Sequence, residues 1–202
     1  MNTSIDKVYA IIVAAGESKR VGKPKQLLGW QNRPLLKLAI DNARLLLGER
    51  VIVVLGAHAE SIQSAINLAG VTVIVNPDWR EGIASSIRTG VRNLPASAAA
   101  ALILLCDQPL IAPAHIRKLL SGWQNEPACL VASQYKDSVG VPALFPAEFF
   151  GHLLKLEGNR GAKRVLLAYP QSLLKIPLPE AEIDIDTMGD FDRLKGQHSV
   201  EE

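Results

Sequence analysis

The sequence lacks the features by which secreted and zinc-binding proteins are recognised. Two of its 202 residues are cysteines, Cys106 and Cys129, and neither forms a C-x-x-C pair or a cysteine–histidine spacing suited to zinc. Both lie in apolar runs that we expect to be buried strands. So few cysteines in a chain of this length exclude a disulfide scaffold and fit a protein of the reducing cytoplasm.

Long hydrophobic runs are missing as well. No segment has the ~20 consecutive apolar residues that a membrane-spanning helix needs. The apolar run at residues 8–15 is shorter, follows Asp6 and leads directly into the charged loop at 17–25. We therefore expect a first core strand there rather than a signal peptide, and no membrane partner.

An excess of one charge is also absent. The 22 lysines and arginines nearly balance the 20 acidic residues, which leaves a net charge of +2 without a long basic run. This balance argues against a general nucleic-acid-binding protein. Hydrophobic residues make up 48% of the chain, and no repeat, low-complexity segment or linker divides it. We expect residues 1–202 to form a single domain.

What the sequence does contain is a regular alternation of apolar strand-like runs and amphipathic helix-like segments. Continuous apolarity at residues 8–13 is typical of a strand buried on both faces, as in parallel sheets. The same reasoning predicts further strands at 51–55, 71–75, 101–106 and 128–133. Helices are predicted at 34–47, 59–68, 83–94 and 113–122. This order predicts an α/β fold of three layers, α/β/α, around a Rossmann-like, mostly parallel sheet.

The alternation is weaker after residue 134. Residues 140–145 predict a short antiparallel or edge strand, and residues 146–156 and 160–169 predict helices. A short strand is expected at 172–176, and residues 183–187 are either a strand or the end of one, before a last helix at 190–195. We expect the N-terminal half to bind a nucleotide and residues 134–186 to bind an acceptor.

The loop after the first strand is the first candidate site, because ligands of open α/β sheets bind at the carboxyl ends of the strands. Ala14, Ala15 and Gly16 let the backbone approach an anion, and Arg20 and Lys25 add positive charge. The loop is neither a Walker A motif nor a G-x-G-x-x-G turn. It could be a phosphate-binding loop or a solvated basic loop, and its place after a buried strand favours phosphate.

Carboxylates supply the second candidate site. Asp107 directly follows an apolar strand and is suited to a hard cation such as Mg²⁺, although Asp also caps turns. Asp184 and Asp186 would share one face if their segment were extended. An exposed acidic face is the alternative, and it is the stronger one for Asp184. Asp186 can be a second metal ligand only if the fold returns it beside Asp107.

These residues belong to a series of motifs that resembles a known family. The segments are Ala-Ala-Gly-x-Ser-x-Arg-x-Gly-x-x-Lys from Ala14 to Lys25, Gly82 to Ile87, Cys106 to Pro109, Gly140 to Pro142, Gly158 to Ala162 and Asp184 to Thr187. In this order they resemble the MobA-like NTP transferases of molybdenum-cofactor synthesis, within the larger group of sugar-nucleotide transferases. Ala15 and Cys106 resemble members that use CTP, since the guanylyl relatives typically have glycine at both places.

The resemblance implies a nucleotidyltransferase that moves CMP from CTP to the terminal phosphate of molybdopterin and releases pyrophosphate, with Mg²⁺ as cofactor. It implies catalytic roles for Lys25, Arg20 and Asp107, and metal binding by Asp107 and Asp186. The implied nucleotide-binding residues lie in the first loop and at the start of the predicted helix 83–94. They are Ala14, Ala15, Gly16, Glu17, Ser18, Arg20, Lys25, Gly82, Ser85 and Ser86.

Other assignments stay open at this point. Ser85 and Ser86 either face substrate or cap their helix. Arg160 and Lys163 are candidates for the acceptor phosphate, because a glycine-flanked helix start attracts anions, or they form an exposed basic face. Asn159 stands where the family often has Asp. The resemblance leaves room for transient contact with a molybdoenzyme or its chaperone.

Three other functions compete with this interpretation. A nucleotidyltransferase for a sugar or polyol phosphate would share the loop and Asp107 and would differ in residues 134–186. A non-catalytic protein that binds and delivers the cofactor would not need Arg20, Lys25, Asp107 and Asp186 together. A dinucleotide-dependent oxidoreductase would predict the glycine fingerprint that this sequence lacks.

Overall fold

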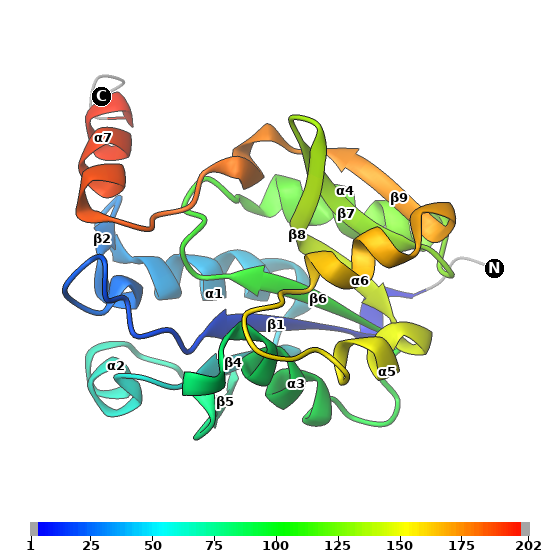
Figure 1. Cartoon of the computed structure of the whole chain (residues 1–202), viewed down its shortest axis with the longest axis horizontal. Helices are drawn as coiled ribbons and strands as arrows, with labels where there is room; N and C mark the ends of the chain where they lie inside the picture. Colours follow the sequence, from blue (N-terminus) through cyan, green and yellow to red (C-terminus); the bar gives the residue numbers. More distant parts are fainter. Residues whose placement is uncertain (1–3, 199–202) are drawn as a thin grey trace.

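The structure, a computed structural model that describes residues 4–198, is built around a seven-stranded sheet (Figure 1). The strands are β1 (Val8–Ala14), β4 (Val51–Leu55), β5 (Thr72–Val75), β6 (Ala100–Leu105), β7 (Leu130–Tyr135), β8 (Ser138–Pro146) and β9 (Leu173–Pro177). Their order is β5-β4-β1-β6-β8-β7-β9, and only β8 runs antiparallel to its neighbours. The expected mostly parallel sheet is confirmed.

Helices cover both faces of this sheet. On one face lie α1 (Leu35–Leu47), α2 (Ala59–Ala65) and α4 (Pro113–Asn125), and on the other lie α3 (Ile83–Arg92), α5 (Phe150–Leu153) and α6 (Lys163–Ala168). Because side chains alternate along a strand, β1 serves both layers: Ile12 packs with the α1 side and Ile11 with the α3 side. The predicted three-layer α/β fold is therefore confirmed, with most helix bounds shifted by a few residues.

The antiparallel strand β8 lies inside the sheet, between β6 and β7, and not at its edge. Of the two alternatives for residues 140–145, the antiparallel strand is confirmed and the edge strand is not. Pro142 cannot donate a ladder hydrogen bond, which normally keeps proline at edges. Here the pairing of β7 with β8 shifts between Ala132 and Ser133, and the Ser133 hydroxyl donates to the Pro142 carbonyl at 2.7 Å. The irregularity accommodates the proline in a central strand.

The chain after β9 also differs from the sequence-based prediction. Residues 183–187 form no strand and cross the end of the sheet as an irregular segment, where the Ile185 N–H donates to the Asp107 carbonyl at 2.9 Å. The predicted last helix exists as α7 (Met188–His198). Figure 1 shows it standing beside the small hairpin of β2 (Gly29–Trp30) and β3 (Arg33–Pro34), where Phe191 meets Trp30 edge-on at 6.4 Å.

The two cysteines do not both lie in strands. Cys106 follows β6 and is buried, whereas Cys129 precedes β7, is partly exposed and has its sulfur 3.3 Å from the Glu126 carboxylate. The prediction of a buried strand around Cys129 began two residues too early, because Ala128 and Cys129 extend the apolar run without joining the sheet. Within residues 4–198, no helix has both the length and the apolarity to cross a membrane.

Candidate active site

A cleft of about 320 Å³ opens at the carboxyl ends of β1 and β6. These two strands are parallel neighbours, so the loops that follow them meet at the same edge of the sheet. The cleft is lined by Val13, Ala14, Ala15, Gly16, Glu17, Lys25, Gln26, Trp79, Arg80, Gly82, Ile83, Ser86, Leu105, Cys106, Asp107 and Asn159. The structure thus brings together residues from four of the six motifs, including Asn159 of the motif from Gly158 to Ala162.

The first loop is shaped by Gln26, which is fully buried. Its side-chain Nε2 donates to the carbonyls of Ala14, at 2.8 Å, and Gly16, at 3.1 Å. The hydroxyl of Ser18, a residue with a left-handed φ of 59°, accepts from the Lys25 N–H at 3.1 Å. Since their carbonyls are turned toward the buried side chain of Gln26, Ala14 and Gly16 are held at the cleft wall.

Four charged side chains gather at one end of the cleft. The Lys25 ammonium forms an ion pair with Asp107 and lies 3.9 Å from Asp186. Asp186 in turn pairs with Arg20 at 3.0 Å. The condition placed on Asp186 is met, because the fold returns it beside Asp107. Gln108 contributes to this return, since its Nε2 donates to the Ala181 carbonyl at 2.9 Å.

The electrostatic environment of Lys25 keeps it charged. Burial by itself would lower the pKa of the ammonium, but Asp107, with a smaller contribution from Asp186, more than offsets this and raises it. Burial also raises the pKa of the neighbouring Cys106 thiol to about 12, so this thiol stays protonated. Lys25 is therefore a permanent cation at the cleft wall.

The two carboxylates fit a hard divalent cation. The Oδ1 atom of Asp107 is buried and has no hydrogen-bond partner among residues 4–198, so its lone pairs are unsatisfied. The same part of the chain holds no group of three or more His, Cys, Asp or Glu side chains suited to a metal. Two carboxylates completed by phosphate oxygens are the usual set for Mg²⁺.

The opposite wall of the cleft is the start of α3. Gly82 has a φ of 118°, and a Cβ there would come within 2.5 Å of the Gly158 carbonyl and of Asn159 Oδ1. Only glycine lets these segments meet. Ser86 lines the cleft, whereas Ser85 does not: its hydroxyl lies within 2.9 Å of the carbonyls of Asp78 and Gly82. Ser85 thus neither lines the cleft nor caps α3, whose N-cap is Gly82; its hydroxyl ties the first turn of the helix to the turn before it.

A second pocket of about 180 Å³ adjoins the first and shares Ile83 and Leu105 with it. Its other walls include the apolar side chains of Ile87, Ile103 and Val141. The polar groups around it are Gln108, Tyr135, Lys163 and Asp184. Partial burial, followed by repulsion from Asp107, raises the pKa of Asp184 to about 7. Because most of this lining comes from residues 134–186, the pocket lies where the acceptor was expected.

Besides Ser85 and Asp186, three predicted residues lie outside the walls of both pockets. Arg20 is exposed at the rim of the cleft and is joined to it through Asp186. Ser18 acts on the loop backbone, as described above. Arg160 is exposed, and its N–H donates to the Glu157 carbonyl at 3.2 Å within a turn. Of the two acceptor candidates, only Lys163 lines the second pocket.

Two cleft features could not be found from sequence. Gln26 looks like any polar residue after a lysine, and its burial depends on the path of the first loop. Trp79 lines the cleft, stacks under the Arg80 guanidinium at 4.3 Å and packs on Gly56, an arrangement that its place in the loop before α3 does not reveal. Neither arrangement has a local sequence signal, because both depend on contacts between distant segments.

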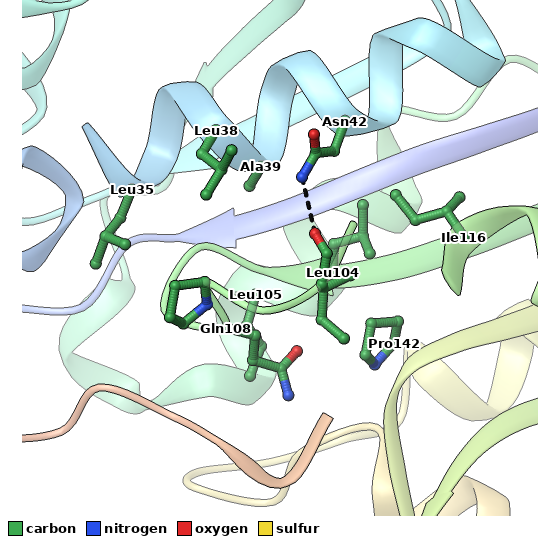
Figure 2. A pocket seen from close by; sticks show the side chains of 11 residues that line it. Leu35, Leu38, Ala39, Asn42, Leu104, Leu105, Gln108, Ile116 and Pro142 are labelled. Carbon is green, nitrogen blue, oxygen red and sulfur yellow. Dashed lines mark hydrogen bonds between the residues drawn. The ribbon is translucent and has the colours of Figure 1, made fainter. Parts of the chain in front are cut away.

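A third hollow, between α1 and the sheet, is too small for a substrate (Figure 2). Its volume is about 10 Å³, and leucine, isoleucine and proline side chains make up most of its lining. The single hydrogen bond drawn there runs from Asn42 Nδ2 to the Ile111 carbonyl at 2.8 Å and ties α1 to the loop before α4. This hollow is a packing gap of the core.

Comparison with known proteins identifies the family. Residues 10–173 match the model of the MobA-like NTP transferase domain. The chain belongs to this family. It is accordingly a nucleotidyltransferase of the MobA-like type, and the matched residues include the first loop, Asp107 and most of the second pocket.

Two relatives of this chain are named for different activities. The chain is 28% identical to the molybdenum cofactor cytidylyltransferase of Escherichia coli over 193 residues, which cover 95% of this chain and 97% of that protein. It is 34% identical to the nicotine blue oxidoreductase of Paenarthrobacter nicotinovorans over 127 residues, which cover 59% of this chain and 58% of that protein. The chain thus matches little more than half the length of the second relative.

The fold has solved counterparts. Rv0371c of Mycobacterium tuberculosis superposes with a TM-score of 0.82 at 28% identity, covering 95% of this chain and 98% of that one. The same protein in complex with manganese superposes with a TM-score of 0.78 at 28% identity, covering 93% and 97%.

Proposed function

We propose that this MobA-like NTP transferase moves CMP from CTP to the terminal phosphate of molybdopterin and releases pyrophosphate, with Mg²⁺ as cofactor. The observation that carries the proposal is the meeting of Lys25, Asp107 and Asp186 at the end of a 320 Å³ cleft. A non-catalytic carrier would not need these groups together. The E. coli relative, which spans nearly the whole chain, is a molybdenum cofactor cytidylyltransferase.

In the proposed reaction an acceptor phosphate oxygen attacks the α-phosphorus of the nucleotide. The bond from that phosphorus to the bridging oxygen breaks, and pyrophosphate leaves with the electron pair. Lys25 would contact the α-phosphate and stabilise the charge that develops there, and Arg20 would hold the leaving phosphates at the rim. Backbone N–H groups around Ala15 and Gly16 would cradle the triphosphate.

Asp107 and Asp186 would hold the Mg²⁺ ion. The unpartnered Oδ1 of Asp107 supports this assignment, since a buried carboxylate oxygen without a donor needs a cation. Mg²⁺, when bound, would stabilise the negative charge on the phosphate oxygens. The carboxylates of this chain would hold that charge at the end of the cleft, where the phosphates are expected.

The nucleotide and the acceptor would occupy adjoining pockets. Ala15 and Cys106, the two positions that resemble CTP-using members, both line the cleft. The second pocket offers apolar walls for a ring system and Lys163 for a negative group. Because Ile83 and Leu105 border both pockets, a nucleotide in one would lie next to an acceptor in the other.

The test is pyrophosphate release by the purified chain with Mg²⁺ and each of CTP, GTP, ATP and UTP. Molybdopterin, with and without molybdenum, serves as acceptor, and Lys25→Ala is the control. Release with CTP that is lost in the variant is the expected result. Release with another nucleotide would overturn the CTP assignment, and no release with any nucleotide would overturn the molybdopterin assignment and move the search to sugar and polyol phosphates.

The relative named an oxidoreductase calls for one parallel assay. The same preparation is incubated with NADH or NADPH and a redox-active dye, and absorbance at the nicotinamide band is followed. We expect no dye-dependent oxidation, because the loop after β1 lacks the G-x-G-x-x-G turn. Turnover in this assay would favour the reductase function over nucleotidyl transfer.

Replacing Lys163 with methionine should raise the KM for the acceptor about tenfold and leave the KM for CTP within about twofold, because a charge-assisted contact is lost only in the second pocket. Its ammonium now donates to the Ser138 hydroxyl at 2.6 Å, a contact that an acceptor phosphate could replace. Steady-state kinetics with each substrate varied in turn measure both constants. Arg164→Met, on the same helix but outside the pocket lining, is the matched control. Equal changes in both KM values would argue against the assignment.

A further inference from the structure

In the structure, Lys25 lies between the two carboxylates that would bind a metal ion. Its ammonium pairs with Asp107 and lies 3.9 Å from Asp186. The side chains of Lys25 and Asp107 are only 18% and 12% exposed, so water screens their attraction poorly. Together with Arg20, which pairs with Asp186, the lysine therefore balances the two negative charges that would attract a cation.

A divalent cation at this site and the observed lysine contact exclude one another. Asp107 has two oxygens: Oδ2 faces Lys25, and Oδ1 is buried without a partner. A cation held by Asp107 and Asp186 together would lie beside the ammonium, where like charges repel. Lys25 must then move away from the carboxylates. It needs a new anionic partner, because burying an unpaired ammonium costs free energy.

A nucleotide supplies such a partner. Lys25 itself lines the cleft that would receive the triphosphate. Phosphate oxygens can therefore pair with its ammonium in place of the carboxylates, while the side chain stays in the cleft. Arg20, which is 68% exposed and pairs with the outer oxygen of Asp186, can turn toward the same phosphates at little cost. Both carboxylates are then released from their internal cations together.

We propose that Lys25 acts as an internal counter-ion. In the free enzyme its ammonium pairs with the metal-binding carboxylates, and it leaves them only when nucleotide phosphates become its new partners. This rests on the proposed function, since it requires Asp107 and Asp186 to be metal ligands and the cleft to hold a nucleotide. The consequence is that the free enzyme binds a divalent cation weakly. Replacing Lys25 by an uncharged residue should therefore strengthen cation binding to the free enzyme.

The test measures Mn²⁺ binding to the full chain by electron paramagnetic resonance of the free ion, which needs no catalysis. Without nucleotide, Lys25→Met should bind Mn²⁺ about tenfold more tightly than the unmodified chain. Lys23→Met is the matched control, because Lys23 lies in the same loop but is exposed and forms no ion pair with another residue of the described range. It should bind Mn²⁺ within about twofold of the unmodified chain.

Two further measurements keep the result interpretable. Lys25→Gln, which keeps a polar end for Asp107, repeats the titration, and circular dichroism confirms that each variant is folded. Asp107→Asn in the Lys25→Met background should abolish the gain, which shows that the ion binds at this site. A gain in Lys25→Met that persists without Asp107 would overturn the proposal.

The outcomes separate this proposal from the proposed function. If Lys25→Met and Lys25→Gln bind Mn²⁺ no more tightly than the unmodified chain, while CTP still raises Mn²⁺ affinity in that chain, the counter-ion role is wrong and the proposed function stands. If none of CTP, GTP, ATP and UTP raises the Mn²⁺ affinity of the unmodified chain, the metal–nucleotide site itself is wrong, and both fall.

Discussion

Replacing Asp107 with asparagine should lower kcat for nucleotidyl transfer about 10³-fold, the upper range for loss of one preorganised electrostatic contact. Asparagine keeps the shape of the side chain and removes its charge. The change deprives Lys25 of its ion-pair partner and removes the buried oxygen that we assign to the metal. Both effects act on the phosphates, so the loss should appear in kcat more than in the KM for CTP.

The measurement is pyrophosphate release at saturating CTP and acceptor over a range of Mg²⁺ concentrations. Asp192→Asn, which neutralises an exposed carboxylate on α7, serves as the matched control and should keep full activity. Circular dichroism of both variants shows whether they are folded. A kcat for Asp107→Asn within about tenfold of the unmodified chain would contradict the assignment of Asp107 to the reaction centre.

Replacing Gly56 with alanine should destabilise the chain by about 3 kcal/mol, which corresponds to a fall in Tm of roughly 6–12 °C. A Cβ at this position would lie 2.6 Å from Trp79 Cβ and 2.7 Å from the Ala15 carbonyl. Neither atom is the flexible end of a side chain, so the two loops that flank the cleft must move apart. Gly56 ends β4 at the place where these loops meet.

Thermal unfolding measures this loss, and Gly16→Ala is the matched control. A Cβ on Gly16 meets nothing within 4 Å, and the residue lines the cleft. Its Tm should stay within about 2 °C of the unmodified chain, while its KM for CTP rises because the methyl group stands where the backbone approaches phosphate. If Gly56→Ala unfolds at the same temperature as Gly16→Ala, the close packing at Gly56 does not limit stability.

The layers and most of the sheet followed from sequence because their signals are local. The apolar runs at β1, β4 and β6 are typical of strands buried on both faces, and parallel strands place their carboxyl ends at one edge. That rule places the loop with Lys25 and the residue after β6, Asp107, at the same edge of the sheet. The structure shows them in contact.

The parts that sequence did not predict depend on contacts between distant segments. The place of β8 inside the sheet depends on the irregular pairing at Ser133 that accommodates Pro142. The burial of Gln26 depends on the two carbonyls that it binds. The position of Ser85 under the turn before α3 was left open, since a serine near a helix start can cap it or face a ligand equally well.

The sequence by itself determined the α/β layers, the loop that lines the cleft and the identity of the charged groups. Periodicity and residue type can be recognised within short segments, without knowledge of distant contacts. Only the tertiary structure decided that Asp186 reaches Asp107. Their segments are 79 positions apart, and the irregular chain at 183–187 joins β6 through one backbone hydrogen bond from Ile185 to Asp107. No local pattern encodes such a contact, because its free energy comes from burying both segments together.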